Sequence, residues 1–231
     1  MNYTNRYREL NSYFCLGRDV QLPETKCNIR FFSFNSNGNN YQSMQDADHI
    51  FSDKVSENTS FVYPVFVPRN VIKSDKAILL MHGLNERNWS KYLTWAEFLC
   101  NATGKIVILF PIAYHVNRSP EAWSNPRNLQ LIYESRKMKN GVDRSLSFAN
   151  VALSERITQN PHRFYSSGRQ TVSDITQLVG QIKAGMHPLF HSGAHGDVFA
   201  FSIGAFLSQL TVMAKPCGLF DGAKVFRVCG G

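Results

Sequence analysis

The sequence predicts an α/β protein built on a doubly wound, mainly parallel sheet with helices on both faces. Two short, continuously apolar runs, at residues 77–81 and 106–110, are typical of strands buried on both faces. Between them, residues 89–100 have apolar side chains at helical spacing. This strand–helix–strand order predicts a parallel pair of strands joined by a right-handed crossover.

The same alternation continues toward the end of the chain. The pattern predicts a helix over 171–183, a strand over 198–201, a helix over 204–214 and a last strand over 224–228. Short links between these elements support a sheet that is covered on both faces.

The remaining segments are predicted as additions to this single domain of residues 1–231. Two β-like runs, at 29–34 and 61–67, predict antiparallel edge strands within an N-terminal β extension over 1–68. Residues 113–167 contain no clear strand and two Asn-Pro pairs, so we interpret them as a long basic insertion or lid. Within it, 129–139 and 148–157 are candidate helices.

Composition excludes several classes of protein. The chain has 231 residues, of which 43% are hydrophobic and 18% are charged, and this excludes a disordered, collagenous or coiled-coil chain. No apolar run approaches the roughly 18 residues of a spanning helix. The first residues, MNYTNRYREL, contain no secretory signal, so we expect a cytoplasmic protein without a membrane span.

The net charge of +8 is concentrated in one part of the chain. Residues 87–169 contain 12 basic and 5 acidic residues, whereas the rest is nearly balanced. A basic surface attracts phosphates and other anions, but no nucleic-acid motif accompanies it, so we expect no nucleic-acid partner. If the insertion covers a pocket, its charge would favour anionic substrates.

Cysteines and histidines give no metal signature. The five cysteines are odd in number and widely spaced, which argues against a disulfide framework or a zinc site. Three of them have apolar neighbours and are predicted as core residues: Cys100, Cys217 and Cys229. His187, His191 and His195 lie close in sequence, but intervening glycines and a proline argue against one helical face. We expect neither a metal nor a cofactor.

Ser202 is the principal candidate for chemistry. It stands between an apolar strand and an apolar helix in Ala200-Phe201-Ser202-Ile203-Gly204. A sharp strand-to-helix turn exposes its corner side chain and crowds the positions two residues away, which therefore must be small. Ala200 and Gly204 meet this requirement. The competing interpretation is a serine that only caps the following helix.

The second motif, His82-Gly83, directly follows the first buried strand. Together with the Ser202 turn and the strand order, it makes residues 76–231 resemble the α/β-hydrolase superfamily, apart from the insertion. The resemblance implies that Ser202 is a nucleophile, and that the backbone N–H groups of Leu84 and Ile203 form the oxyanion hole. The competing interpretation of His82-Gly83 is a plain turn after a strand.

The resemblance also implies an acid and a histidine after the nucleophile, in that order. Only Asp221 is acidic after Ser202, and its Phe-Asp-Gly context predicts a turn residue; no histidine follows. Three explanations stay open: a chain that lacks its C-terminal part, a histidine from upstream such as His115, or a protein that is not a hydrolase. His49 and His162 are predicted to be surface residues.

These observations favour a serine hydrolase that acts on a carboxylic ester of a small molecule through an acyl-enzyme on Ser202. The alternative is a non-catalytic binding or interaction protein that keeps the fold without a working triad. The sequence does not determine the oligomeric state.

Overall fold

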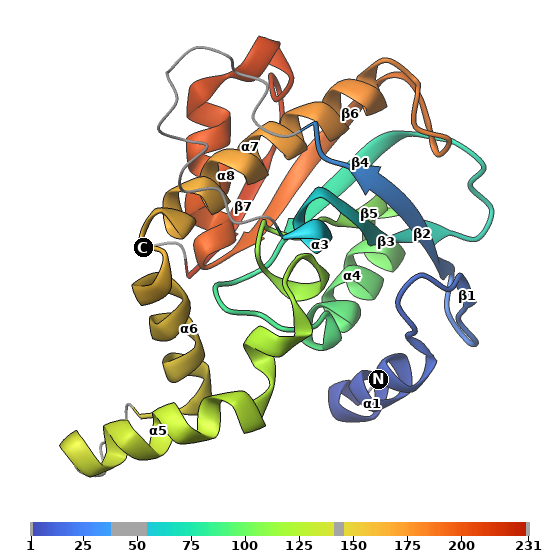
Figure 1. Cartoon of the computed structure of the whole chain (residues 1–231). Coiled ribbons are helices and arrows are strands. Elements are labelled where there is room, and N and C mark those ends of the chain that lie inside the picture. Colours follow the sequence, from blue (N-terminus) through green and yellow to red (C-terminus); the bar gives the residue numbers. More distant parts are fainter. Residues whose placement is uncertain (1, 38–54, 141–145, 230–231) are drawn as a thin grey trace.

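The computed structural model describes residues 2–37, 55–140 and 146–229. Its centre is one seven-stranded sheet with the strand order β1-β2-β3-β5-β4-β6-β7 (Figure 1). The strands are β1 (Val20–Gln21), β2 (Cys27–Asn35), β3 (Ser60–Pro68), β4 (Ser74–Met81), β5 (Ile106–Leu109), β6 (Phe190–Phe201) and β7 (Val225–Val228).

The sheet is mixed and mainly parallel, as the sequence predicts. Strands β5, β4, β6 and β7 are parallel neighbours. β3 runs antiparallel to both β2 and β5, so β2 has the same direction as the parallel group. The apolar runs of β4 and β5 are buried because helices cover both faces of the sheet.

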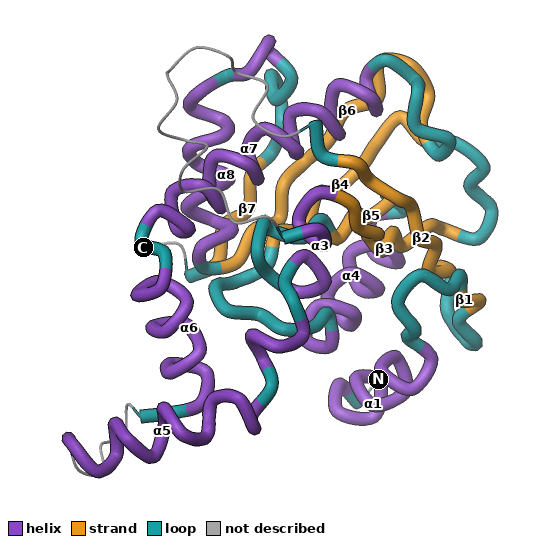
Figure 2. Tube along the Cα trace, viewed as in Figure 1, coloured by secondary structure: helices purple, strands orange, loops and turns teal. Residues whose placement is uncertain are grey.

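Helices form a layer on each side of the strands (Figure 2). One core joins the sheet to α1 (Tyr3–Tyr13) and α4 (Ser90–Thr103). The other core joins it to α7 (His162–Lys183) and α8 (Ile203–Ala214). The short helical turns are α3 (Ser56–Thr59), η1 (Val116–Arg118), η2 (Glu121–Ser124) and η3 (Pro216–Gly218).

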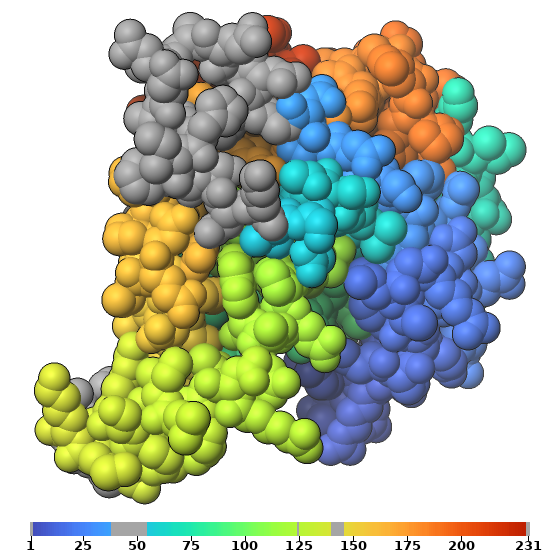
Figure 3. Space-filling view, in the orientation of Figure 1, coloured from blue at the N-terminus to red at the C-terminus, as the bar shows by residue number. Residues whose placement is uncertain are grey.

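The basic segment after β5 is helical. It contains α5 (Pro126–Asn140) and α6 (Phe148–Gln159), which share a small apolar cluster of their own around Leu129, Val151 and Ala152. In Figure 3 the yellow-green atoms of α5 form a lobe that projects from the body of the molecule.

Several sequence expectations differ from the structure in extent. α7 begins nine residues earlier than predicted, and β6 begins eight residues before the predicted strand of 198–201. The polar N-terminus, in which no helix was expected, forms α1, with Leu10 fully buried. Its Arg6 forms a buried ion pair with Glu97 of α4, a contact between positions 91 residues apart.

Two of the three cysteines predicted as core residues are not buried. Cys100 lies in the core of α4, but Cys217 and Cys229 are exposed. Both exposed cysteines have a positive φ: Cys217 interrupts the short helical turn η3, and Cys229 lies in the bend after β7.

Candidate active site

Ser202 occupies a strained turn between β6 and α8. Its backbone has φ 54° and ψ −120°, a combination that residues other than glycine rarely adopt. Its N–H donates to Val228 O at 2.9 Å, and its carbonyl accepts from the N–H groups of Ala205 and Phe206. The turn is therefore fixed to β7 on one side and to the first turn of α8 on the other.

The positions two residues from Ser202 are closely packed. Ala200 is fully buried. At Gly204, a Cβ would lie 2.6 Å from the carbonyl oxygen of His82 and 2.9 Å from that of Met81. No side chain fits there, and the first turn of α8 therefore packs directly against the end of β4.

The turn after β4 is held by hydrogen bonds on both sides of Gly83. Gly83 N–H donates to Tyr92 Oη at 2.8 Å, and this hydroxyl donates to Glu86 Oε1 at 2.7 Å. A Cβ on Gly83 would lie 3.0 Å from the ring of Phe201. Among the described residues, no hydrogen bond uses the backbone N–H of Leu84 or Ile203.

The two turns lie at a switch in sheet topology. From β4 the chain passes to β5 on one side, and from β6 it passes to β7 on the other, although β4 and β6 are neighbours. Open α/β sheets bind ligands in the crevice that such a divergence leaves at the carboxyl ends of the strands. Leu84 and Ser202 follow these two ends.

His82 is a structural residue in this arrangement. Its Nε2 accepts from Ile112 N–H at 2.9 Å, so Nδ1 carries the proton and donates to Gly83 O at 2.8 Å. The ring is fully buried, and burial lowers its pKa to about 3. With both nitrogens bonded and the neutral form favoured, His82 cannot take a proton from a nucleophile.

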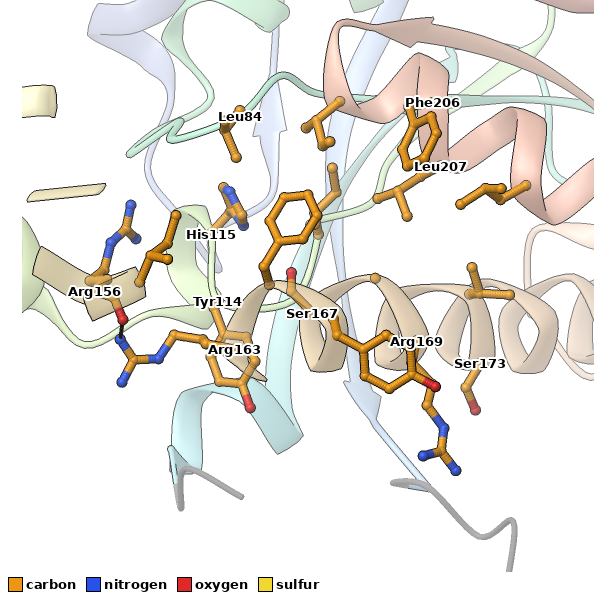
Figure 4. A pocket seen from close by; sticks show the side chains of 18 of the residues that line it. Leu84, Tyr114, His115, Arg156, Arg163, Ser167, Arg169, Ser173, Phe206 and Leu207 are labelled. Carbon is orange, nitrogen blue, oxygen red and sulfur yellow. Dashed lines mark hydrogen bonds between the residues drawn. The ribbon is translucent and has the colours of Figure 1, made fainter. Parts of the chain in front are cut away.

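A cavity of about 760 Å³ adjoins the candidate site (Figure 4). Leu84, His115 and Ile203 line it, whereas Ser202 itself lies just outside the lining, beside Ile203. Leu84 and His115 face each other at one end, between the turn after β4 and the loop after β5. The other lining residues come mainly from α6, α7 and α8.

His115 lines this cavity, and its unpaired ring nitrogen is buried. Its Nδ1 donates to Ala113 O at 2.9 Å, while Nε2 is buried and has no partner in the described part of the chain. Burial, with the positive charges of Arg156 and Arg118, lowers its pKa to about 4. His115 is therefore neutral at pH 7.

A buried ion pair fixes the loop that carries His115. Arg118 Nη2 lies 2.6 Å from Asp174 Oδ2 of α7, and the guanidinium also donates to Pro111 O and Asn58 O. Neither charged side chain is accessible to solvent. Removing one partner would leave a buried charge, so the loop is held rigidly to α7.

The other histidines and Asp221 lie away from this site. His187 is buried in the turn before β6, with Nε2 3.0 Å from Tyr63 Oη, and His191 and His195 are exposed on β6. His162 is exposed at the start of α7, and His49 lies outside the described residues. Asp221 is an exposed turn residue, as its context predicts.

Within the described ranges, no group of three or more His, Cys, Asp or Glu side chains is arranged to hold a metal ion. None of the helices in that part of the chain is both long and apolar enough to cross a bilayer.

Sequence reasoning missed three groups that organise the site: the Tyr92 hydroxyl, the Arg118–Asp174 pair and Arg156. The helical spacing over 89–100 predicts Tyr92 only as part of an apolar helix face. The position of Asp174 is a signal in the sequence, because it lies on the same helical face as the apolar Ile175, Leu178 and Ile182 of α7. A polar residue on such a face indicates a buried partner.

Comparison with known proteins gives a family and a fold. A model described as a family of unknown function, DUF6051, matches residues 1–231. No curated protein gives a significant sequence match.

Similar solved structures include the PEG-bound complex of a novel cold-adapted esterase from an Arctic intertidal metagenomic library. It has a TM-score of 0.50 and 15% identity, over 92% of this chain and 65% of that one. A putative acetyl xylan esterase from Bacteroides fragilis NCTC 9343 has a TM-score of 0.48 and 10% identity, over 94% of this chain and 49% of that one. The chain thus spans less than two thirds of either protein, and the first likeness shows a shared α/β, hydrolase-like fold.

Proposed function

Because the chain belongs to DUF6051, a family of unknown function, we propose its activity from the site itself: it is a serine hydrolase of the α/β-hydrolase type, and Ser202 is the nucleophile. The observation that carries the proposal is the backbone of Ser202, strained at φ 54° and ψ −120°, with Gly204 pressed against the end of β4. Strain of this kind persists where the surrounding structure enforces it, often at functional sites.

In the proposed reaction, Ser202 Oγ attacks the carbonyl carbon of a carboxylic ester and loses its proton to a base. The N–H groups of Leu84 and Ile203 stabilise the oxyanion that forms on the carbonyl oxygen. Ile203 is the first residue of α8, so the helix dipole adds positive potential there. Collapse of the intermediate expels the alcohol, and water then releases the acid from the acyl-enzyme.

The proposal assigns no general base. His82 has both ring nitrogens bonded. No described carboxylate bonds to His115, and burial outweighs the hydrogen bond to Ala113 O and the charge of Glu86, so the neutral ring is favoured. This observation keeps the alternative open: a binding or interaction protein that retains the fold without turnover.

We also propose a division of the domain. Residues 1–68 form an N-terminal extension that supplies β1, β2 and β3, of which β1 lies at the edge of the sheet while β2 and β3, predicted as edge strands, lie inside it. Residues 113–167 form an insertion that roofs the cavity. The lining residues Arg156 and Arg163 come from this insertion, which supports the second assignment.

Labelling with a fluorophosphonate probe tests the hydrolase proposal. We expect the probe to modify wild-type protein on Ser202, and the Ser202→Ala variant to remain unmodified. Ser173→Ala is the matched control, because Ser173 lines the same cavity but lies on α7. Wild-type protein that stays unlabelled, or a label that survives in Ser202→Ala, would favour the non-catalytic alternative.

A further inference from the structure

The cavity has a positively charged end. Arg156 of α6 and Arg163 of α7 both line it, and the N–H of the Arg163 side chain donates to the carbonyl of Arg156 (Figure 4). Their guanidinium carbons lie 5.7 Å and 4.6 Å from the centroid of the Trp123 ring. Two cations therefore share the neighbourhood of one indole.

Arg156 is half-buried, and it differs from two of the buried arginines, Arg6 and Arg118. Arg6 pairs with Glu97, and Arg118 pairs with Asp174. Arg156 donates to Asn85 Oδ1 and to Ala152 O, and it has no ion pair with any described carboxylate. A partly buried guanidinium without an anion is costly, because water no longer compensates its charge.

The electrostatics of this end are unfavourable without an anion. Burial, followed by the positive charges of Arg163 and Arg87, lowers the pKa of Arg156 to about 10. The positive charge of Arg156 also lowers the pKa of His115 and so opposes protonation of that ring. An anionic group bound here would remove the repulsion between like charges.

The rest of the cavity is largely apolar. Its lining from the three helices includes Leu153, Ile157, Phe164, Val172, Phe206 and Leu207. A space of about 760 Å³ falls in the range of small-molecule sites, which combine apolar walls with a few placed polar groups. A ligand that suits both ends must itself be amphipathic.

We propose that the cavity binds an amphipathic anion, with its carboxylate or phosphate group against the guanidinium of Arg156 and its apolar chain between α6, α7 and α8. That such an anion is part of an ester substrate rests on the proposed function. That the cavity binds such an anion does not depend on whether the protein hydrolyses an ester.

Titration calorimetry with three eight-carbon probes tests the binding: octanoate, octyl phosphate and the neutral octanol. We expect at least one anionic probe to bind at least about tenfold more tightly than octanol, since charge-assisted hydrogen bonds commonly contribute tenfold to hundredfold in affinity. The more tightly bound anion identifies carboxylate or phosphate as the preferred group. Added salt should weaken the anions more than the alcohol.

Variants locate the charged group. Arg156→Gln should lower the affinity for the preferred anion by about tenfold or more and leave the affinity for octanol unchanged. Arg156→Lys should keep part of the preference for the anion over octanol. Arg127→Gln is the matched control, because Arg127 is an exposed arginine of the same insertion and lies outside the cavity. Circular dichroism of each variant checks that it is folded.

Equal affinity for octanol and both anions, or unchanged anion affinity in folded Arg156→Gln, would overturn the proposal. Ser202→Ala should bind the anion as wild-type protein does. Failure of the hydrolase proposal is therefore seen separately, as absent labelling with intact binding.

Discussion

Gly204 and His82 meet so closely that a Cβ on Gly204 would lie 2.6 Å from the carbonyl oxygen of His82. This contact joins the first turn of α8 to the turn after β4, two segments that are more than 100 residues apart in the chain. It brings the N–H groups of Ile203 and Leu84 to the same edge of the sheet. The site therefore depends on a position that has no side chain.

Replacing Gly204 with alanine should destabilise the fold. The added methyl group meets backbone atoms, which cannot move aside as a flexible side chain would, so we expect a loss of about 1–3 kcal/mol in the free energy of unfolding. Urea denaturation measures it. Gly180→Ala on α7 is the matched control, because its Cβ meets nothing within 4 Å. That variant should gain about 0.5–1 kcal/mol, and a Gly204→Ala variant that is equally stable would contradict the close contact.

The strain at Ser202 predicts an unusual order of stabilities. Glycine adopts positive φ freely, so Ser202→Gly should relieve about 1–3 kcal/mol of backbone strain, less the roughly 0.4–1 kcal/mol that glycine's flexibility costs in the unfolded state. Ser202→Ala removes the same hydroxyl but keeps the strain. Urea denaturation of both variants should find Ser202→Gly the more stable, and the reverse order would refute a strained backbone at this position.

Local sequence patterns were sufficient to predict the part of the fold that carries the site. The apolar runs of β4 and β5 have one interpretation in a protein of this size, since strands buried on both faces must be apolar throughout. The small residues around Ser202 predict a turn that is closely packed against its neighbours. In the structure Gly204 packs directly against the carbonyl oxygen of His82.

Contacts that depend on distant partners could not be predicted in the same way. α1 is stabilised by an ion pair between Arg6 and Glu97, and its own sequence is polar. The Arg118–Asp174 pair and the free nitrogen of His115 arise only when the loop after β5 packs against α7. Each depends on tertiary packing, which outweighs local propensity.

The buried histidines predict a loss of stability in acid. Burial lowers the pKa of His115 to about 4, while an unfolded histidine titrates near 6.5. Between these values the unfolded chain binds more protons, so this contribution is complete above about pH 6.5 and is lost as pH falls toward 4. His82 and His187, whose pKa values burial lowers to about 3 and about 4, act in the same direction.

The variant His115→Gln isolates one of these groups. In urea denaturation between pH 6.5 and 4.5, its free energy of unfolding should depend less steeply on pH, by up to about 1.4 kcal/mol per pH unit. His191→Gln, which alters an exposed side chain on β6, is the matched control and should keep the wild-type dependence. A wild-type slope in His115→Gln would mean that the ring is not buried in its neutral form.

Tyr92 predicts a link between the fold of α4 and the proposed chemistry. Its hydroxyl accepts from Gly83 N–H at 2.8 Å and donates to Glu86 Oε1 at 2.7 Å, which fixes the turn that carries the N–H of Leu84. In Tyr92→Phe the ring still fills the core, but the buried N–H of Gly83 loses its acceptor. We expect a loss of about 1–3 kcal/mol in the free energy of unfolding.

The same variant should slow the labelling of Ser202 by a fluorophosphonate, because a turn that is less firmly held positions the Leu84 donor less well. One removed oxyanion donor costs about a hundredfold to a thousandfold in rate, so a displaced one should cost about tenfold or more. Tyr7→Phe, at an exposed position of α1, should change neither quantity. If Tyr92→Phe is destabilised but labels at the wild-type rate, Tyr92 has a purely structural role and the Leu84 N–H does not contribute to the reaction.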